Sequence, residues 1–196
     1  MIIVNSQLTD LSKNPCLFQN ITKQTKNHIK NSLKYLEGKV KPTDKILDIG
    51  QRSPLTDAIS FKFGVEIDNT QGDLDTSFLI PNNEFGLIRY DIIIYSHTIE
   101  HQFNPLGTLL KLSEVLVPGG CLYIFTVDRG KLLWCKGHYH EIDSYRMELL
   151  LRRAGFKIIS KYKYKIWRYW LKYLRGLRPI LRLFLEYNVI YKIKIR

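Results

Sequence analysis

Apolar residues in the middle of the chain form two kinds of pattern, which alternate. Asp91–Ser96 is a short run rich in Ile, which is typical of a strand buried on both faces. After Pro105, apolar residues recur at helical spacing: Leu106, Leu109, Leu110, Leu112, Leu116 and Val117. Pro118-Gly119-Gly120 predicts the end of this helix, and Cys121–Val127 predicts a second buried strand. Strand, polar loop, helix and strand in this order make half of a right-handed doubly wound sheet.

The flanking segments continue the same alternation. Before the central unit we expect, in order, an arm (1–19), a helix (20–37), a strand (45–50), a helix (54–61), a strand (63–67) and a loop (76–89). After it we expect a loop (128–137), a helix capped by Asp143 or Ser144, an extended segment (156–165) and a last strand (188–196). Together they predict one α/β domain with a doubly wound, mostly parallel sheet.

Several motifs in the central unit carry a family resemblance. They are Tyr90-Asp91 before the apolar run, Ile99-Glu100-His101, Asn104-Pro105, and Leu112-x-Glu114-x-Leu116-x-Pro118-Gly119-Gly120 before the next strand. This order resembles the second half of the class I S-adenosylmethionine (SAM)-dependent methyltransferase domain, in the group that methylates small molecules, sugars and lipids. The resemblance covers residues 40–160, which would form the core of the domain. It implies a Rossmann-like methyltransferase fold, SAM as the cofactor, and methyl transfer to a small-molecule or glycan acceptor, on a hydroxyl.

The first cofactor motif of the family follows the first strand, usually as Asp-x-Gly-x-Gly-x-Gly. This chain has Asp48 and Gly50, but Gln51-Arg52-Ser53-Pro54 replaces the later glycines. The resemblance implies that Gly50 passes under the methionine part of SAM and that Asp48 orders the turn or meets the amino group, with Gln51 beside them. The alternative is a strand that simply ends in a Gly turn.

Further along the chain, the resemblance implies contacts to the rest of SAM. Asp68 would accept hydrogen bonds from the ribose hydroxyls, with Glu66 as the alternative if the strand is shorter. Asp73 and Leu74 follow in a Gly-Asp-Leu step that would face the adenine. Acids in solvated turns are the alternative for both positions. Ser96 and His97, at the end of the central strand, would lie beside the sulfonium.

Histidines supply the candidate catalytic groups. His101 has an ordinary pKa near neutrality, so it could take a proton from an acceptor hydroxyl, or it could only orient its loop. His140 is a second candidate for the substrate pocket or a structural residue, and His28 is expected at the surface or in a groove. His97-x-x-Glu100-His101 also spells an inverted zinc-protease motif, but it begins at a strand end and Asn104-Pro105 would end any helix, so we expect no metal site.

Charge divides the chain into two parts. The formal net charge is +12, and residues 157–196 hold 12 Lys or Arg and one acid. Within this tail, residues 166–187 form an expected helical insertion with one basic stripe: Arg168, Lys172, Arg175, Arg178 and Arg182. The insertion is suited to binding an anionic membrane surface or RNA, or to packing on the sheet or on a second subunit of a homodimer.

The alternative to an enzyme is a catalytically silent protein of this fold that binds RNA or a larger assembly through this basic region.

Composition and length set the remaining limits. The chain has 196 residues, 45% hydrophobic and 24% charged, as expected for one globular domain. Cys16, Cys121 and Cys135 lack metal-ligand spacing and are expected as reduced thiols. We see no secretory signal and no spanning segment, so we expect a cytoplasmic protein, or one peripheral to the inner face of a membrane.

Overall fold

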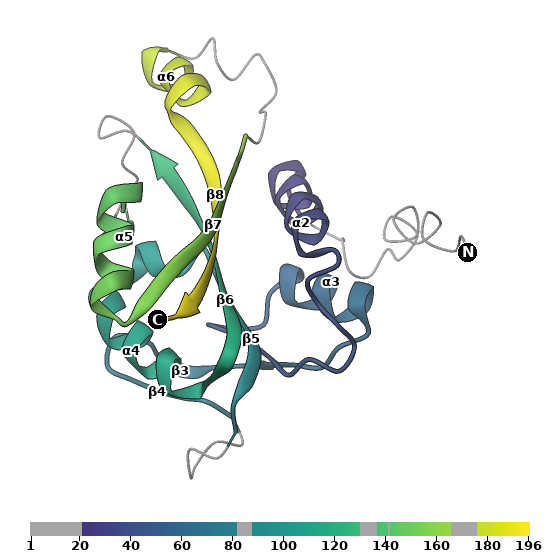
Figure 1. The fold of residues 1–196 in the computed structure, drawn as a ribbon. Coiled ribbons are helices and arrows are strands. Elements are labelled where there is room, and N and C mark those ends of the chain that lie inside the picture. The colour runs from purple at the N-terminus through teal and green to yellow at the C-terminus, as the bar shows by residue number, and fades with distance from the viewer. Residues whose placement is uncertain (1–20, 82–87, 130–136, 141, 166–175) are drawn as a thin grey trace.

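A six-stranded mixed sheet forms the centre of the protein (Figure 1). The computed structural model describes residues 21–81, 88–129, 137–140, 142–165 and 176–196. The strands of the sheet are β1 (Ile46–Asp48), β2 (Ile67–Asn69), β5 (Tyr90–Ser96), β6 (Leu116–Arg129), β7 (Phe156–Tyr164) and β8 (Glu186–Ile195). Their order is β2-β1-β5-β6-β8-β7, in which the first four are parallel and β8 runs antiparallel to both neighbours. The predicted fold class is confirmed.

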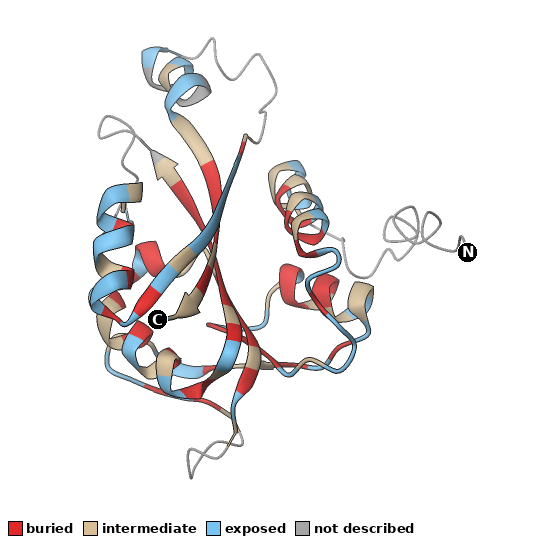
Figure 2. Cartoon of the chain, viewed as in Figure 1, coloured by how far each residue is buried: buried red, intermediate tan, exposed pale blue. Residues whose placement is uncertain are grey.

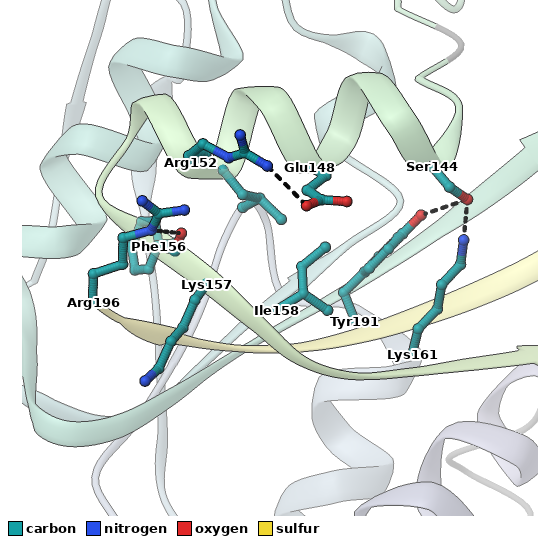
Figure 3. Close-up of a pocket in the computed structure, with 10 residues that line it drawn as sticks. Ser144, Glu148, Arg152, Phe156, Lys157, Ile158, Lys161, Tyr191 and Arg196 are labelled. Carbon is teal, nitrogen blue, oxygen red and sulfur yellow. Dashed lines mark hydrogen bonds and ion pairs between the residues drawn. The ribbon is translucent and has the colours of Figure 1, made fainter.

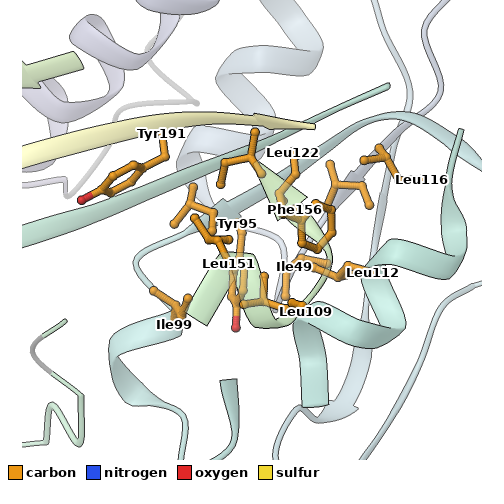
Figure 4. Close-up of a cluster of buried hydrophobic side chains, with 14 of the residues drawn as sticks. Ile49, Tyr95, Ile99, Leu109, Leu112, Leu116, Leu122, Leu151, Phe156 and Tyr191 are labelled. Atoms are coloured by element: carbon orange, nitrogen blue, oxygen red, sulfur yellow. The ribbon is translucent and has the colours of Figure 1, made fainter. Parts of the chain in front are cut away.

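Helices cover both faces of this sheet. They are α2 (Lys23–Leu36), α3 (Pro54–Phe63), α4 (Pro105–Val115) and α5 (Ser144–Arg153), with the single-turn 3-10 helix η2 (Ile99–His101) and, before β8, α6 (Leu177–Leu185). The helices α2 and α3 lie on one face, and α4 and α5 lie on the other (Figure 1). Ile93 and Tyr95 of β5 pack in the core under α4 and α5, where Figure 4 shows Tyr95, whereas Ile92 and Ile94 pack in the core under α2 and α3. The central strand is thus buried on both faces, as its sequence predicts (Figure 2).

Side-chain caps fix where the helices begin. Ser53 caps α3 in a reciprocal capping box with Thr56. Asn104 Oδ1 accepts from Gly107 N at 3.0 Å at the start of α4, and Asp143 Oδ1 accepts from Arg146 N at 2.9 Å at the start of α5. Asp143, not Ser144, is therefore the cap of α5. Because each cap follows a strand or loop at the same edge of the sheet, these helix starts help to build the candidate site.

Several predicted boundaries are wrong. Phe63 ends α3 and does not begin a strand, because Gly64 adopts φ +64° and caps the helix, so β2 starts only at Ile67. The expected loop 76–89 contains β4 (Ser77–Leu79), which pairs with β3 (Gln71–Asp73) in a separate antiparallel hairpin. The strand expected from Cys121 begins at Leu116, which pairs with Tyr90 before a register shift. The last strand begins two residues early, at Glu186.

Parts of the predicted insertion and arm lie outside the described residues. Those are 1–20 and 166–175, which include Cys16, Arg168 and Lys172. Within the described part, α6 is the observed helix of the insertion, and Cys121 is a free thiol. In the same part of the chain, no helix combines the length and the apolar character needed to cross a bilayer.

The two-sided core leads to a stability prediction for α4. Leu112 is fully buried, whereas Leu110 on the same helix is 46% exposed. We expect Leu112→Ala to lower the free energy of unfolding by about 3 kcal/mol, since it leaves a cavity, and Leu110→Ala to change it by less than about 0.5 kcal/mol. Urea denaturation followed by circular dichroism measures both. Equal losses in the two variants would contradict this account of the core.

Candidate functional site

The carboxyl ends of β1 and β5 meet at one edge of the sheet. Asp48 and Ile94 are register partners, and Ile49 N donates to Ile94 O at 2.9 Å. One step further, a Cβ added to Gly50 would lie 3.6 Å from Thr98 Oγ1. Gly50 is therefore close to the segment that follows Ser96. Loops at the carboxyl ends of parallel strands are where ligands bind in open α/β sheets, so this edge is the candidate site.

Gly50 forms a turn that only glycine adopts easily. Its φ is +106°, and its N–H donates to Thr70 Oγ1 at 2.8 Å. Asn69 Nδ2 donates to Gly50 O at 3.3 Å from the end of β2. Gln51 is exposed and next to it Arg52 pairs with Asp57 at 2.6 Å. Sequence reasoning found the glycine but missed Asn69 and Thr70, because nothing in their local pattern marks the contact across two strands.

Asp48 points into the protein under this turn. It is 4% exposed, accepts a hydrogen bond from the Thr56 hydroxyl, and lies 3.5 Å from Asn69 Nδ2. Burial raises the pKa of Asp48 to about 6, although its hydrogen bonds from Thr56 and Asn69 work in the opposite direction. Of the two roles predicted for Asp48, these contacts favour ordering the turn.

The acids predicted for ribose and adenine lie in or near β2 and β3. Asp68 lies inside β2, where Oδ2 accepts from Tyr90 OH at 2.8 Å, while the alternative Glu66 is exposed. Burial, and then this hydrogen bond, raise the pKa of Tyr90. Asp73 ends the exposed β3 and accepts from Asp75 N at 3.0 Å. Leu74 is partly buried against the core. The structure does not bring Asp73 into the main sheet, and the ligand contacts of these residues stay predictions.

His97 follows β5 in a strained conformation. It has φ +50°, and it is the one non-glycine residue with positive φ in the described ranges. Its N–H donates to Phe125 O of β6 at 2.8 Å, and its ring meets the ring of His28 edge-on, with centroids 4.5 Å apart. Such strain persists where surrounding contacts fix the residue, as they do here, and it is frequent at functional sites.

His28 is buried, so the prediction of a surface or groove position is wrong. It is 9% exposed on α2, and its Nδ1 is hydrogen-bonded to Tyr164 OH of β7 at 2.8 Å. Burial, and then the charge of His97, lower the pKa of His28 to about 3, so its ring is neutral. The sequence signal was present, since His28 falls on the apolar face of its helix, but only tertiary contacts identify its partners.

Glu100 is a buried carboxylate at the same edge. It is 2% exposed; Oε1 lies 3.2 Å from His97 Nδ1, and Oε2 accepts from Thr126 Oγ1 at 3.2 Å. Burial alone would raise the pKa of Glu100, but the hydrogen bond and charge of His97 outweigh it, so the pKa lies below its ordinary value. Glu100 is therefore ionised and connects η2 to β6.

His101 is exposed and has a defined tautomer. Its Nδ1 lies 2.8 Å from Gly137 O, and a carbonyl only accepts, so Nδ1 carries a proton. In the neutral ring, Nε2 then carries the lone pair. His140 differs, because its N–H donates to Glu100 O and its Nε2 lies 3.2 Å from Phe103 O. The contacts of His140 favour its structural alternative, while Nε2 of His101 is able to accept a proton or bind an electrophile.

The Gly50 turn is the feature of this edge that fits a bound polar cofactor. Among the described residues, a Cβ at Gly50 would meet only Thr98 within 4 Å, so the backbone is open to close approach. The buried His28 Nε2 has no hydrogen-bond partner among the described residues, but it is inaccessible and so gives no support to a ligand contact. An open glycine backbone is compatible with the methionine end of SAM at this position.

A separate cavity of about 370 Å³ lies between α5 and the β7–β8 hairpin (Figure 3). On one side the Lys161 ammonium and Tyr191 OH converge on Ser144 Oγ, and on the other Arg196 Nε donates to Phe156 O at 3.2 Å. None of the site residues predicted from the sequence lines this cavity. It is therefore distinct from the edge formed by β1 and β5.

Comparisons with known proteins agree with this geometry. No family model and no curated protein sequence matches the chain. Coclaurine N-methyltransferase, bound to N-methylheliamine and SAH, aligns with TM-score 0.63 and 11% identity over 90% of this chain and 75% of its own. A chain from the complex of the Haloferax volcanii Trm112 methyltransferase activator with a methyltransferase aligns with TM-score 0.61 and 12% identity, over 95% and 96%.

A phosphoethanolamine-type N-methyltransferase from Haemonchus contortus, in complex with phosphomonomethylethanolamine and S-adenosylhomocysteine, gives TM-score 0.61 and 13% identity, over 87% of this chain and 52% of its own. Likeness at these identities concerns the fold. The chain has the Rossmann-like fold of class I SAM-dependent methyltransferases. Two of the structures similar to it were determined with small-molecule ligands bound.

The raised pKa of Asp48 predicts a pH-dependent effect on stability. Between pH 3.8 and about pH 6, Asp48 keeps a proton in the folded protein that it has lost in the unfolded chain. Stability therefore falls as the pH rises through this interval. Relative to Asp48→Asn, the free energy of unfolding of the wild type should fall by up to about 3 kcal/mol across this pH interval, because the pKa shift is about two units. Urea denaturation at pH 4 to 7 measures the difference, with Asp57→Asn as a control for removing one acid. A difference that does not vary with pH would refute the assignment.

Proposed function

We propose that the protein transfers a methyl group from SAM to a small-molecule or glycan acceptor, on a hydroxyl oxygen. The observation that carries the proposal is the juxtaposition of the Gly50 turn with the segment after Ser96, where Glu100 and His101 follow. At this edge of the sheet, the open backbone of Gly50 would face the cofactor, and the polar side chains of Glu100 and His101 would face the acceptor. The shared fold with SAM-dependent methyltransferases supports the same reading.

The proposed cofactor contacts divide along the sheet edge. Gly50, on the turn held by Asp48 and flanked by Gln51, faces the methionine end. The remaining contacts are Asp68 at the ribose, Asp73 and Leu74 at the adenine, and Ser96 and His97 near the sulfur. Asp68 Oδ2 already accepts from Tyr90, so Oδ1 is the oxygen with the larger remaining capacity for the ribose.

Bound SAM supplies a methyl group activated by the positive charge on its sulfur. Most of the catalytic contribution of the chain is then alignment of the acceptor. His101 is the proposed base, because the bond from Nδ1 to Gly137 O fixes its tautomer and leaves the lone pair on Nε2. The same bond would also serve the alternative role, in which His101 only orients the loop.

The rival function is a catalytically silent protein of the same fold that binds RNA or a larger assembly. Its supporting feature is the exposed Gln51-Arg52 pair where the family has glycine. Of the predicted RNA-binding or homodimer segment, residues 166–175 lie outside the described residues. Direct measurement of SAM binding separates the two functions, since only the enzyme requires the cofactor.

A peripheral membrane contact through α6 is supported by the exposed face of that helix. Leu177, Ile180 and Phe184, spaced by three and four residues, are 72%, 41% and 61% exposed. These three side chains therefore leave apolar surface of α6 open to solvent. Figure 1 shows α6 at one end of the fold, leading directly into β8. An exposed apolar helix face in a strongly basic tail suits an anionic membrane surface.

Calorimetric titration with SAM tests the proposed enzyme. We expect the wild type to bind, and Gly50→Ala to bind at least tenfold more weakly, since φ +106° is unfavourable for Ala and its Cβ would occupy the backbone face. Gly64→Ala is the matched control, because Gly64 also has positive φ but caps α3 away from the edge. Absence of heat from the wild type at high micromolar SAM would favour the silent rival.

Sedimentation with anionic lipid vesicles tests the membrane contact. The double variant Leu177→Ala and Phe184→Ala keeps the net charge but removes apolar area, so we expect at least tenfold weaker binding. Leu79→Ala combined with Phe61→Ala is the control, since these side chains are 71% and 53% exposed on β4 and α3. Equal sedimentation of both double variants and the wild type would eliminate α6 as the contact.

A further inference from the structure

We propose that Glu100, His101 and His138 form a binding site for a divalent first-row transition metal ion on the acceptor side of the sheet edge. One ligand atom from each of the three side chains lies within 4.8 Å of the other two. That spacing needs only small side-chain adjustments to surround an ion whose bonds to nitrogen and oxygen are about 2.0–2.2 Å long.

This site is not the zinc-protease motif that the sequence spells. That motif would use His97 and His101 on one α-helix, whereas Glu100 and His101 lie on the 3-10 turn η2, and His97 pairs with Glu100. The third ligand, His138, comes from the loop before α5. The proposed site does not need a helical zinc motif, because the fold, and not local spacing, brings His138 to Glu100.

Contacts around the ligands already prepare them for a cation. A metal-binding histidine commonly donates its other ring N–H to a carbonyl, and His101 Nδ1 does so to Gly137 O at 2.8 Å. The carboxylate of Glu100 is oriented through both oxygens, by His97 and Thr126, and each oxygen keeps a further lone pair.

The loop that carries His138 is fixed against η2. His140 N donates to Glu100 O at 3.2 Å, and the rings of Phe103 and Tyr139 stack with centroids 3.9 Å apart. Within this frame, the rings of His101 and His138 lie 4.6 Å apart at 83°. The ligand atoms of two imidazoles and one buried carboxylate therefore gather within 4.8 Å of one another, and the exposure of His101 gives solvent access to the cluster.

The ligand set indicates both the class of metal and its use. Two imidazoles and one carboxylate suit Zn²⁺, Co²⁺, Mn²⁺ or Fe²⁺ better than Mg²⁺ or Ca²⁺, which prefer oxygen. Three protein ligands with open positions are typical of catalytic sites, whereas structural zinc has four.

The role in methyl transfer rests on the proposed function. An acceptor hydroxyl at an open position would lose its proton to solvent water more easily, and its oxygen would form the new O–C bond as the S–C bond breaks with its electrons on sulfur. With the ion bound, Nε2 of His101 is a ligand, so the base role proposed above applies to the metal-free protein.

Titration of the SAM-free full-length protein with Co²⁺ tests the site through the visible absorption of bound cobalt. We expect one Co²⁺ per chain, displaced by Zn²⁺ and not by Mg²⁺. His101→Ala and His138→Ala should each weaken Co²⁺ binding at least a hundredfold. The control is His140→Gln, whose amide can still donate to Phe103 O and which should bind as the wild type does.

The outcomes separate this proposal from the enzyme. No stoichiometric Co²⁺ binding by the wild type, or equal losses in His140→Gln and His138→Ala, would overturn the metal site. SAM calorimetry on the same preparations reports the proposed function independently. Co²⁺ binding without SAM binding would leave the metal site and remove the methyltransferase, whereas SAM binding without Co²⁺ binding would do the reverse. Circular dichroism of His138→Ala confirms that the variant is folded.

Discussion

Parallel pairing of β1 with β5 is the constraint on which the candidate site depends. The strand β1 has only three residues, yet it is paired on both sides, with β2 and with β5. Parallel neighbours cannot be joined by a tight turn, so each connection must cross the sheet as a helix or long segment and all carboxyl ends share an edge. That geometry places the Gly50 turn next to Thr98, although 47 residues separate them in the chain. The contacts proposed for the methionine end of the cofactor and for the metal depend on this edge, whereas Asp73 lies in the separate β3–β4 hairpin.

The edge holds two buried carboxylates whose environments act in opposite directions. Burial of Asp48 outweighs its hydrogen bonds from neutral donors and the charge of Arg52, so its pKa rises. Glu100 is as deeply buried, but the imidazole of His97 stabilises its charge and its pKa falls. The first group therefore reduces stability near neutral pH, while the second is held as an anion.

Sequence patterns predicted what local periodicity determines. The central strands, the helix after Pro105 and the cap of α5 could be located because apolar spacing and capping residues act within a few positions of the chain. The hairpin of β3 and β4 was missed because each strand has three residues, too few for alternation to stand out. The burial of His28 and the support of Gly50 by Asn69 and Thr70 depend on contacts between distant segments, which no spacing rule encodes.

The same limit explains why the sequence suggests His101 as a base or as a residue that orients its loop, whereas the proposed metal site uses it as a ligand. The sequence places His101 at a strand edge, and an imidazole there suggests proton transfer. The structure adds three features: a fixed tautomer, the carboxylate of Glu100 close by, and His138 brought in from the loop before α5. A base needs only the first of these. A second imidazole and a carboxylate gathered close to His101 match the ligands that a divalent transition-metal ion prefers, and this is the observation on which the proposed metal site rests.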